Sequence, residues 1–160
     1  MTAALEPLAD LLQKKHWMLA TAESCTGGLI AAACTDLAGS SNWFERGFVS
    51  YSNAAKTELL GVEPALIASE GAVSQAVARA MAAGAVARSH AEVSVAVTGI
   101  AGPAGGSADK PVGTVWFAWQ APGWQQAELR RFSGDRAEVR RATAQHALAG
   151  LLKRLSAPSV

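Results

Sequence analysis

The stretch from residue 17 to residue 37 constrains the fold most strongly, because it has the pattern of a strand, a tight turn and a helix in succession. Residues 17–21 are apolar enough for a buried strand, and Leu29–Leu37 has its Ala and Leu residues at helical spacing. Gly27 and Gly28 lie between them and allow the chain to turn sharply. A strand that leads directly into a helix is typical of a βα unit, so this stretch predicts an α/β protein.

The same alternation of strands and helices continues along the chain. Pro122 and Gly123 make a turn between the last two expected strands, which adds an antiparallel pair. We therefore expect a three-layer α/β/α sandwich with a mixed, mostly parallel sheet, as a single domain over residues 1–160 with its core at about 5–155. Strands are expected at residues 17–21, 44–51, 92–98, 112–120 and 125–132, and helices at about 4–15, 29–37, 53–60, 64–69, 75–89 and 136–155.

The composition argues against several classes of partner and location. Half of the 160 residues are hydrophobic, 17% are charged and the formal net charge is +1. A surface for nucleic acid or for an anionic membrane needs a clustered basic excess, so we expect neither partner. No apolar run approaches the roughly 20 residues of a membrane span, and the N-terminus lacks a signal-peptide pattern. Cys25 and Cys34 match neither a disulfide framework nor a zinc site, which favours reduced thiols and a cytoplasmic location.

Ser24 follows the first expected strand and stands at the turn into the helix. The first amides of a helix lack internal partners, and together with the helix dipole they favour an anion or the oxyanion of a carbonyl under attack. A hydroxyl beside such a helix start is half of an acyl-transfer site. The alternative is that Ser24 or Thr26 is simply the N-cap of the helix. Cys25 is the rival nucleophile, and because neighbours in a tight turn point in different directions, only one of them can face a substrate.

A serine nucleophile needs a base, and the histidines are poor candidates for that role. They fall at expected helix ends or inside the last helix, where a structural role is more common: His16, His90 and His146. No histidine pair or acidic cluster has the spacing of metal ligands, which argues against a metal hydrolase.

Lys56 is the better base, because Ser52 or Asn53 is expected to cap a helix that has Lys56 in or near its first turn. The helix dipole there opposes a positive charge, and partial burial would lower the lysine pKa further. A neutral lysine accepts a proton from serine, either directly or through the hydroxyl of Tyr51. The alternative interpretation is a solvated helix lysine and a half-buried strand tyrosine.

Five blocks of the sequence are informative as an ordered set. They are Ala22–Gly28, Tyr51–Asn53 with Lys56, Gly99–Pro103, Lys110–Val115 and Phe132–Arg136. Together the blocks resemble the CinA C-terminal family, over roughly residues 5–155. One glycine-rich loop would be weak evidence, whereas five blocks in the family's order are specific.

The resemblance implies an amidohydrolase that converts nicotinamide mononucleotide (NMN) to nicotinate mononucleotide and ammonia, in pyridine-nucleotide (NAD) recycling. It also implies a serine nucleophile at Ser24 with Tyr51 and Lys56 in support, no metal or organic cofactor, and a homodimer. In that scheme Lys56 takes the proton of Ser24, and amides near Thr26 to Gly28 stabilise the oxyanion. Water then resolves the acyl-enzyme.

The remaining site candidates are groups expected to contact this substrate. Its phosphate needs a cradle, either backbone amides of the loop from Gly99 to Gly106 or the side chains of Arg136 and Arg140, four apart on one helix face. A plain turn and an exposed helical pair are the respective alternatives. The expected substrate-binding residues are Glu23, Cys25, Thr26, Gly27, Gly28, Gly99, Ile100, Ala101, Gly102, Arg136 and Arg140.

Two other interpretations belong to different functional classes. A catalytically silent nucleotide-binding module would use the same glycine loops, although it would not need a nucleophile and a base. An assembly partner would be built around exposed aromatic residues: Trp43, Phe44 and Trp124. Trp43 and Phe44 follow the polar turn Gly39–Asn42, which predicts an exposed anchor for a homodimer, or else a pair folded back onto the core.

Overall fold

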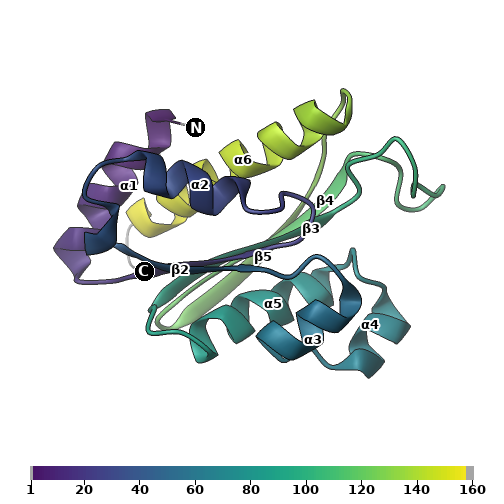
Figure 1. Cartoon of the computed structure of the whole chain (residues 1–160), viewed down its shortest axis with the longest axis horizontal. Coiled ribbons are helices and arrows are strands. Elements are labelled where there is room, and N and C mark those ends of the chain that lie inside the picture. The colour runs from purple at the N-terminus through teal and green to yellow at the C-terminus, as the bar shows by residue number, and fades with distance from the viewer. Residues whose placement is uncertain (1, 158–160) are drawn as a thin grey trace.

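The computed structural model describes residues 2–157, in which five strands form one sheet between two layers of helices (Figure 1). The strands are β1 Leu19–Glu23, β2 Phe44–Val49, β3 Val93–Gly99, β4 Thr114–Ala121 and β5 Trp124–Arg131. The helices are α1 Thr2–Lys15, α2 Leu29–Asp36, α3 Asn53–Leu60, α4 Pro64–Glu70, α5 Gln75–Ala87 and α6 Arg136–Ser156, with a short 3-10 helix at Ser40–Asn42. No helix within the described residues is both long enough and apolar enough to cross a membrane.

The sheet is mixed, with the strand order β2-β1-β3-β4-β5. β1 pairs in parallel with both β2 and β3, whereas β4 runs antiparallel to β3 and β5. α1, α2 and α6 cover one face of the sheet, and α3, α4 and α5 cover the other (Figure 1). This arrangement confirms the predicted α/β/α sandwich, and it brings the carboxyl ends of β1, β2 and β3 to the same edge of the sheet.

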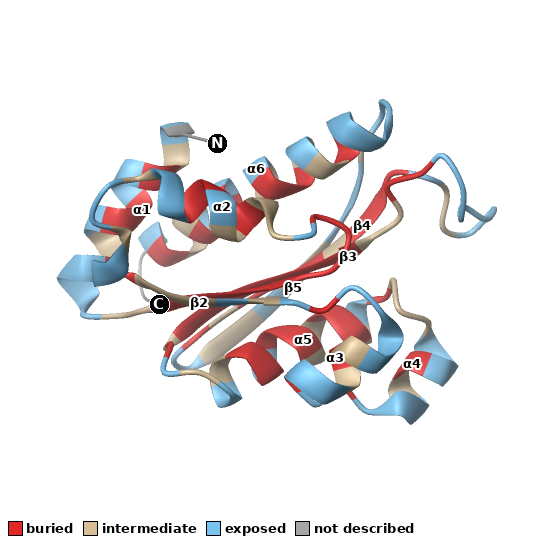
Figure 2. Ribbon diagram, viewed as in Figure 1, coloured by how far each residue is buried: buried red, intermediate tan, exposed pale blue. Residues whose placement is uncertain are grey.

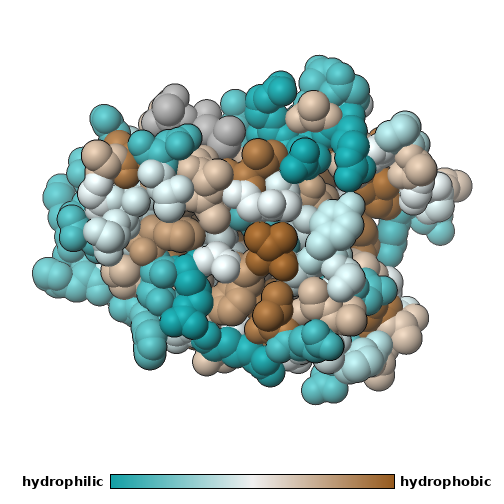
Figure 3. Space-filling model, in the orientation of Figure 1, coloured by the Kyte–Doolittle hydropathy of each residue, from teal (hydrophilic) through white to brown (hydrophobic). Residues whose placement is uncertain are grey.

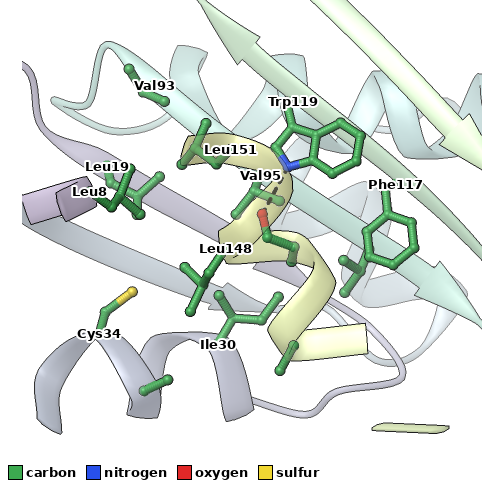
Figure 4. Close-up of a cluster of buried hydrophobic side chains, with 14 of the residues drawn as sticks. Leu8, Leu19, Ile30, Cys34, Val93, Val95, Phe117, Trp119, Leu148 and Leu151 are labelled. Carbon is green, nitrogen blue, oxygen red and sulfur yellow. Dashed lines mark hydrogen bonds between the residues drawn. The ribbon is translucent and has the colours of Figure 1, made fainter. Parts of the chain in front are cut away.

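Each face of the sheet has its own hydrophobic core (Figure 2). The larger core lies under α1, α2 and α6 and includes Trp119, whose indole N–H donates to the carbonyl of Ala147 at 2.9 Å (Figure 4). The smaller core lies under α5, which packs alanines against the sheet. At Gly84 of α5 a Cβ would come within 1.9 Å of the Leu60 carbonyl oxygen, so only glycine lets α5 approach the end of α3 this closely.

The helix starts follow the capping signals in the sequence. Ser52 accepts a hydrogen bond from the Ala55 amide at 3.0 Å at the start of α3, and Ser74 caps α5 in the same way. Asp135 and Glu138 form a reciprocal capping box at the start of α6. β1 and β4 each begin two residues later than expected, and residues 17–18 and 112–113 lie in the loops before them.

Of the two alternatives for Trp43 and Phe44, the structure shows the pair folded back onto the core, and the alternative of exposed aromatic residues, Trp124 included, is wrong. Trp43 is 1% exposed, and Phe44 and Trp124 are half-buried against the same core. The Trp43 carbonyl accepts a hydrogen bond from the Leu19 amide at 2.8 Å, which holds the residue beside the first strand and under the helices of that face. Burying such large rings stabilises the fold by more than the polar turn before them favours exposure to solvent. These residues therefore do not form an aromatic assembly surface.

Candidate active site

A cavity of about 230 Å³ lies at the edge of the sheet where β1, β2 and β3 end. Ligands of open α/β sheets bind at such strand ends, where strands give way to helices and loops. The cavity brings together the turn after β1, the junction between β2 and α3, and the loop after β3. It is lined by Ser24, Cys25, Tyr51, Asn53, Lys56, Ala72, Val73, Thr98, Gly99, Ala101 and Arg136.

A larger hollow of about 450 Å³ lies between α3 and α4 and shares Asn53 with the cavity. Its walls are mostly apolar, and no serine, cysteine, lysine or histidine lines it. The hydroxyl of Thr57, one of its few polar groups, already donates to the carbonyl of Val62 at 2.7 Å. The hollow therefore has no paired nucleophile and base, and the candidate chemistry lies in the smaller cavity.

Ser24 and Lys56 are in direct contact in the smaller cavity. The Nζ of Lys56 donates to Ser24 Oγ at 3.0 Å and to the backbone carbonyl of Tyr51 at 3.0 Å. Ser24 Oγ also lies 3.3 Å from that carbonyl, to which it donates. A hydroxyl and an amine within hydrogen-bond reach of each other are the arrangement that an activated serine nucleophile requires.

The environment of Lys56 favours its neutral form. The residue is 1% exposed and lies in the first turn of α3, where the helix dipole opposes a positive charge. Burial lowers the pKa of its amine, while nearby Cys25 acts in the opposite direction. Among the described residues, no carboxylate forms an ion pair with Lys56. A neutral amine has the lone pair that a base needs.

Cys25 borders the cavity beside Ser24 but is poorly suited to act as the nucleophile. Burial raises the pKa of its thiol to about 11. The thiolate is the reactive form, so at neutral pH the group is almost entirely an unreactive thiol. Because Lys56 contacts Ser24 directly, the geometry also favours Ser24 over its neighbour.

The hydroxyl of Tyr51 is not an intermediary between Ser24 and Lys56 in this arrangement. Tyr51 is 59% exposed, and its hydroxyl accepts a hydrogen bond from Arg136 Nη2 at 3.3 Å. The Nη1 of Arg136 donates to the carbonyl of Gly102 at 2.8 Å. Tyr51 thus contributes its backbone carbonyl to the nucleophile and its ring to the mouth of the cavity, where Arg136 links it to the loop after β3.

The start of α2 is not open to an anionic ligand, contrary to the sequence prediction. Its N-cap is Gly28, so neither Ser24 nor Thr26 caps the helix. The carboxylate of Glu23 accepts hydrogen bonds from amides of the first turn instead. The predicted substrate contact of Glu23 is therefore wrong, since the side chain is buried in the fold and does not line the cavity.

Arg140 contacts the backbone of the turn after β1 and does not line the cavity. Its Nε donates to the Cys25 carbonyl at 3.1 Å, and its Nη2 donates to the Thr26 carbonyl at 3.2 Å. Thr26, Gly27 and Gly28 also lie outside the lining, and the two glycines have φ values of 59° and 108° that form the turn. These four residues shape the turn that carries Ser24.

The loop after β3 contributes only some of its expected residues to the cavity. Gly99 and Ala101 line it, whereas Ile100 and Gly102 do not. The Ile100 amide already donates to the Thr114 carbonyl at 2.9 Å, which extends the pairing of β3 with β4. The Ile100 amide is therefore not available to a ligand, whereas the Ala101 amide has no acceptor among the described residues. Arg136 is the cationic group of the lining other than Lys56.

Four residues of the lining were not predicted as site residues: Asn53, Ala72, Val73 and Thr98. Thr98 ends the strand expected at residues 92–98, so the strand-end rule for ligands in α/β sheets points to it. Its hydroxyl donates to the carbonyl of Ala72 at 2.9 Å. Nothing in the sequence marks Ala72 and Val73, because the path of the chain between α4 and α5 brings them there. Within residues 2–157, no three His, Cys, Asp or Glu side chains gather closely enough to hold a metal ion.

Comparison with known proteins agrees with the family resemblance of the sequence. The family model of the CinA C-terminal domain matches residues 2–155. A protein of Enterobacter agglomerans named nicotinamide-nucleotide amidohydrolase PncC is 54% identical over 143 residues, covering 89% of this chain and 87% of the relative. A protein of the same name from Pseudomonas putida is 52% identical and covers 96% of both chains.

The fold agrees with solved structures as well. A crystal structure of competence damage-inducible protein A from Klebsiella pneumoniae superposes with a TM-score of 0.94 at 37% sequence identity and covers 98% of both chains. Sequence and fold agree over nearly the whole chain. The chain belongs to the CinA C-terminal domain family.

Proposed function

We propose that this protein is a nicotinamide-nucleotide amidohydrolase, which hydrolyses the carboxamide of NMN to nicotinate mononucleotide and ammonia in pyridine-nucleotide recycling. The observation that carries the proposal is the 3.0 Å contact between Lys56 Nζ and Ser24 Oγ in a cavity at the sheet edge. The name of the relatives at 52% and 54% identity supports the choice of substrate. A nucleotide-binding module without catalysis would leave this pairing of a buried amine with a hydroxyl without a purpose.

The Ser24 hydroxyl first rotates from the Tyr51 carbonyl toward neutral Lys56. Lys56 then takes its proton as Ser24 Oγ attacks the carboxamide carbon. The tetrahedral intermediate collapses as the Lys56 ammonium gives a proton to the leaving nitrogen, and ammonia departs. Water then attacks the acyl-enzyme with Lys56 again as the base. The carbonyl of Tyr51 accepts an N–H of Lys56 at 3.0 Å, which helps to turn the amine lone pair toward Ser24.

The oxyanion of the intermediate needs donors in the turn after β1. The Gly27 amide is already bonded to the Ser24 carbonyl at 3.1 Å. The amides of Thr26 and Gly28 lie outside the cavity lining, whereas Cys25 lines it beside Ser24. The Cys25 amide has no acceptor among the described residues, and we assign the oxyanion to it. This amide precedes the ones that the sequence predicted.

The phosphate of NMN is assigned to the side of the cavity that Arg136 lines. A cavity of about 230 Å³ suits the nicotinamide ring better than a whole nucleotide, so the ribose and phosphate extend toward solvent. Arg136 is exposed there, and its guanidinium would exchange its contacts with the Gly102 carbonyl and the Tyr51 hydroxyl for a bidentate pair with the phosphate. Arg140 is less exposed and does not line the cavity, which makes it a weaker candidate.

Release of ammonia from NMN by the purified protein tests the proposed function. Nicotinate mononucleotide serves as the matched control, because it has the same ribose and phosphate but no carboxamide to hydrolyse. We expect ammonia and nicotinate mononucleotide in equal amounts from NMN. Tight binding of NMN with no ammonia above the control would instead identify a binding module.

Tyr51→Phe is expected to lower kcat by less than about tenfold, because it removes a single exposed hydrogen bond to Arg136. The backbone carbonyl that contacts Lys56 remains in this variant. The measurement is steady-state kinetics with NMN. A loss of kcat of more than about a hundredfold would restore the hydroxyl of Tyr51 as a proton relay.

We further propose that the protein is a cytoplasmic homodimer. The buried free thiols of Cys25 and Cys34 fit a reducing compartment. Strand β2 lies at the edge of the sheet, and Val49, Tyr51 and Leu59 are exposed on or near it. Figure 3 shows hydrophobic residues along the middle of this face between more polar margins, a pattern typical of an interface.

The expected solution mass is about twice the 16.5 kDa of one chain in sedimentation at micromolar concentration. Val49→Lys, which places a charge at this edge, should shift the population toward the single chain. A wild-type protein that sediments only as the 16.5 kDa species contradicts the homodimer.

A further inference from the structure

Glu23 is a buried acid that the proposed reaction does not use. It ends β1, is 1% exposed and has no ion pair with any lysine, arginine or histidine among the described residues. Its Oε1 accepts the Thr26 hydroxyl at 2.6 Å and the Ile30 amide at 2.9 Å, and its Oε2 accepts the Ala31 amide at 3.0 Å. A carboxylate kept away from water is retained only where such donors compensate for its desolvation.

These contacts join the two ends of the turn that carries the nucleophile. Ile30 and Ala31 belong to the first turn of α2, whose amides have no partners within the helix and whose dipole favours an anion. Glu23 lies before the turn and these amides lie after it, so its side chain closes the turn from within. Thr26 lies in the middle of the same turn, and its hydroxyl also donates to the Glu23 carboxylate.

The backbone on either side of Ser24 is also fixed to the sheet. The Glu23 carbonyl accepts a hydrogen bond at 2.8 Å from the amide of Ser50, the residue after β2. The Ser24 amide donates to the carbonyl of Val97 in β3 at 3.1 Å. The position of Ser24 relative to the sheet is therefore set. The turn beyond it is held by the carboxylate of Glu23 and by Arg140, which donates to two of the turn's backbone carbonyls.

We propose that Glu23 is a positioning residue, whose buried carboxylate ties the turn of residues 24–28 to the start of α2 and so holds Ser24 Oγ against Lys56 Nζ. The proposal rests on the proposed function for its kinetic consequence. The carboxylate does not touch the substrate, since it lies outside the cavity lining. It also occupies the anion site at the start of α2, so the oxyanion must use amides of the turn itself.

Glu23→Gln is the sharpest variant, because it keeps the size of the side chain. One oxygen can still accept from Thr26 and Ile30, but the new amide group would face the Ala31 N–H with a second donor. Misplacement of a nucleophile by about 1 Å costs roughly a hundredfold in rate, so kcat should fall about 30- to 100-fold. KM should stay within about twofold of the wild-type value, because substrate contacts are unchanged.

Ser94→Ala is the matched control, since it also removes a buried hydrogen bond. The hydroxyl of Ser94 donates to the Ala82 carbonyl at 2.7 Å near the start of β3, at the opposite end from the cavity. Its kcat should stay within about twofold of wild type, even if its thermal stability falls by as much as that of Glu23→Gln.

Amide hydrogen exchange, followed residue by residue by NMR, reports on the turn without any substrate. We expect exchange at Ile30 and Ala31 to become at least about tenfold faster in Glu23→Gln and to be unchanged in Ser94→Ala. Ammonia release by the wild-type protein is measured in the same series. If the wild type releases none, the proposed function fails, and the exchange data still decide whether Glu23 holds the turn.

Several results would overturn the positioning role. They are a kcat of Glu23→Gln within about threefold of wild type, a raised KM with kcat retained, an equal loss of kcat in Ser94→Ala, or unchanged exchange at Ile30 and Ala31. A raised KM would show that Glu23 contacts the substrate. An equal loss of kcat in Ser94→Ala would show that Glu23 only stabilises the fold. A fall in kcat alone, together with faster exchange, supports the proposal.

Discussion

Ser24→Ala is expected to lower kcat for NMN by at least about 10³-fold, because it removes the atom that forms the bond to the substrate carbon. The change deletes one oxygen from a residue that is 7% exposed and leaves Lys56 bonded to the Tyr51 carbonyl. Fold and substrate binding should therefore be retained. Ammonia release measures the loss, and isothermal titration with NMN measures binding by the inactive variant.

Cys25→Ala is the control that separates the two neighbouring candidates. It removes a thiol whose pKa is raised to about 11 and which has no contact with the base like that of Ser24. Its kcat should stay within about tenfold of wild type, with the loss coming from packing in the wall of the cavity. Near-normal activity of Ser24→Ala, combined with an inactive Cys25→Ala, would show that the neighbouring thiol is the nucleophile.

Lys56→Arg is expected to be nearly inactive, with kcat lowered by at least about 10³-fold. A guanidinium keeps the positive charge but does not lose a proton in the working range of pH, so it cannot accept the proton of Ser24. Arginine is also larger than lysine, and Lys56 is only 1% exposed, so the surrounding residues leave little room for the larger side chain. Lys56→Met therefore accompanies it, because methionine has nearly the length of lysine and no base.

Lys56→Met should be as inactive as Lys56→Arg and at least as stable as wild type to chemical denaturation. Burial of an amine without a carboxylate partner opposes folding, and an apolar side chain of similar size removes that penalty. Equal stability with lost activity would assign Lys56 to catalysis. Near-normal kcat with a raised KM in Lys56→Arg would instead show that Lys56 serves only to attract the phosphate.

The wild-type pH profile tests the same base from the other direction. Because burial lowers the pKa of Lys56, the active neutral form is populated at lower pH than for an exposed lysine. Below that pKa, kcat/KM should rise about tenfold per pH unit, and above it the rate should level off. A profile that falls with rising pH through neutrality would contradict a neutral lysine base.

Local sequence patterns predicted the order of strands and helices, with element ends that differ from the structure by about two residues at β1, β2 and β4. Helix starts at Ser52, Ser74 and Asp135 are local events, because a side-chain oxygen a few residues away satisfies the amides of the first turn. For Ser24 and Lys56 the local pattern predicts only a strand-to-helix turn and a position near a helix start. Their proposed catalytic roles come from the resemblance of five ordered blocks to the family, because local pattern also fits a helix cap and a solvated lysine.

Contacts between distant segments were decided by the tertiary structure. That Lys56 contacts Ser24 directly, while the Tyr51 hydroxyl binds Arg136, depends on the distance between the ends of β1 and β2 and on the position of α6. The sequence predicted that Glu23 and Arg140 bind substrate, whereas the structure gives them partners in the turn after β1 and in the first turn of α2. A charged side chain bonds to whichever donors or acceptors the packed fold brings within reach.

Burial of large side chains was likewise decided only by packing. Trp43 follows a polar turn, which locally favours exposure. Its carbonyl, however, accepts a hydrogen bond from the Leu19 amide, and its ring packs under the helices of that face. The free energy of burying that much apolar surface exceeds any local preference of the turn. Hydrogen bonds between residues close in sequence can therefore be predicted from the sequence. The burial of a side chain and its hydrogen-bond partners depend on long-range contacts that only the folded chain makes.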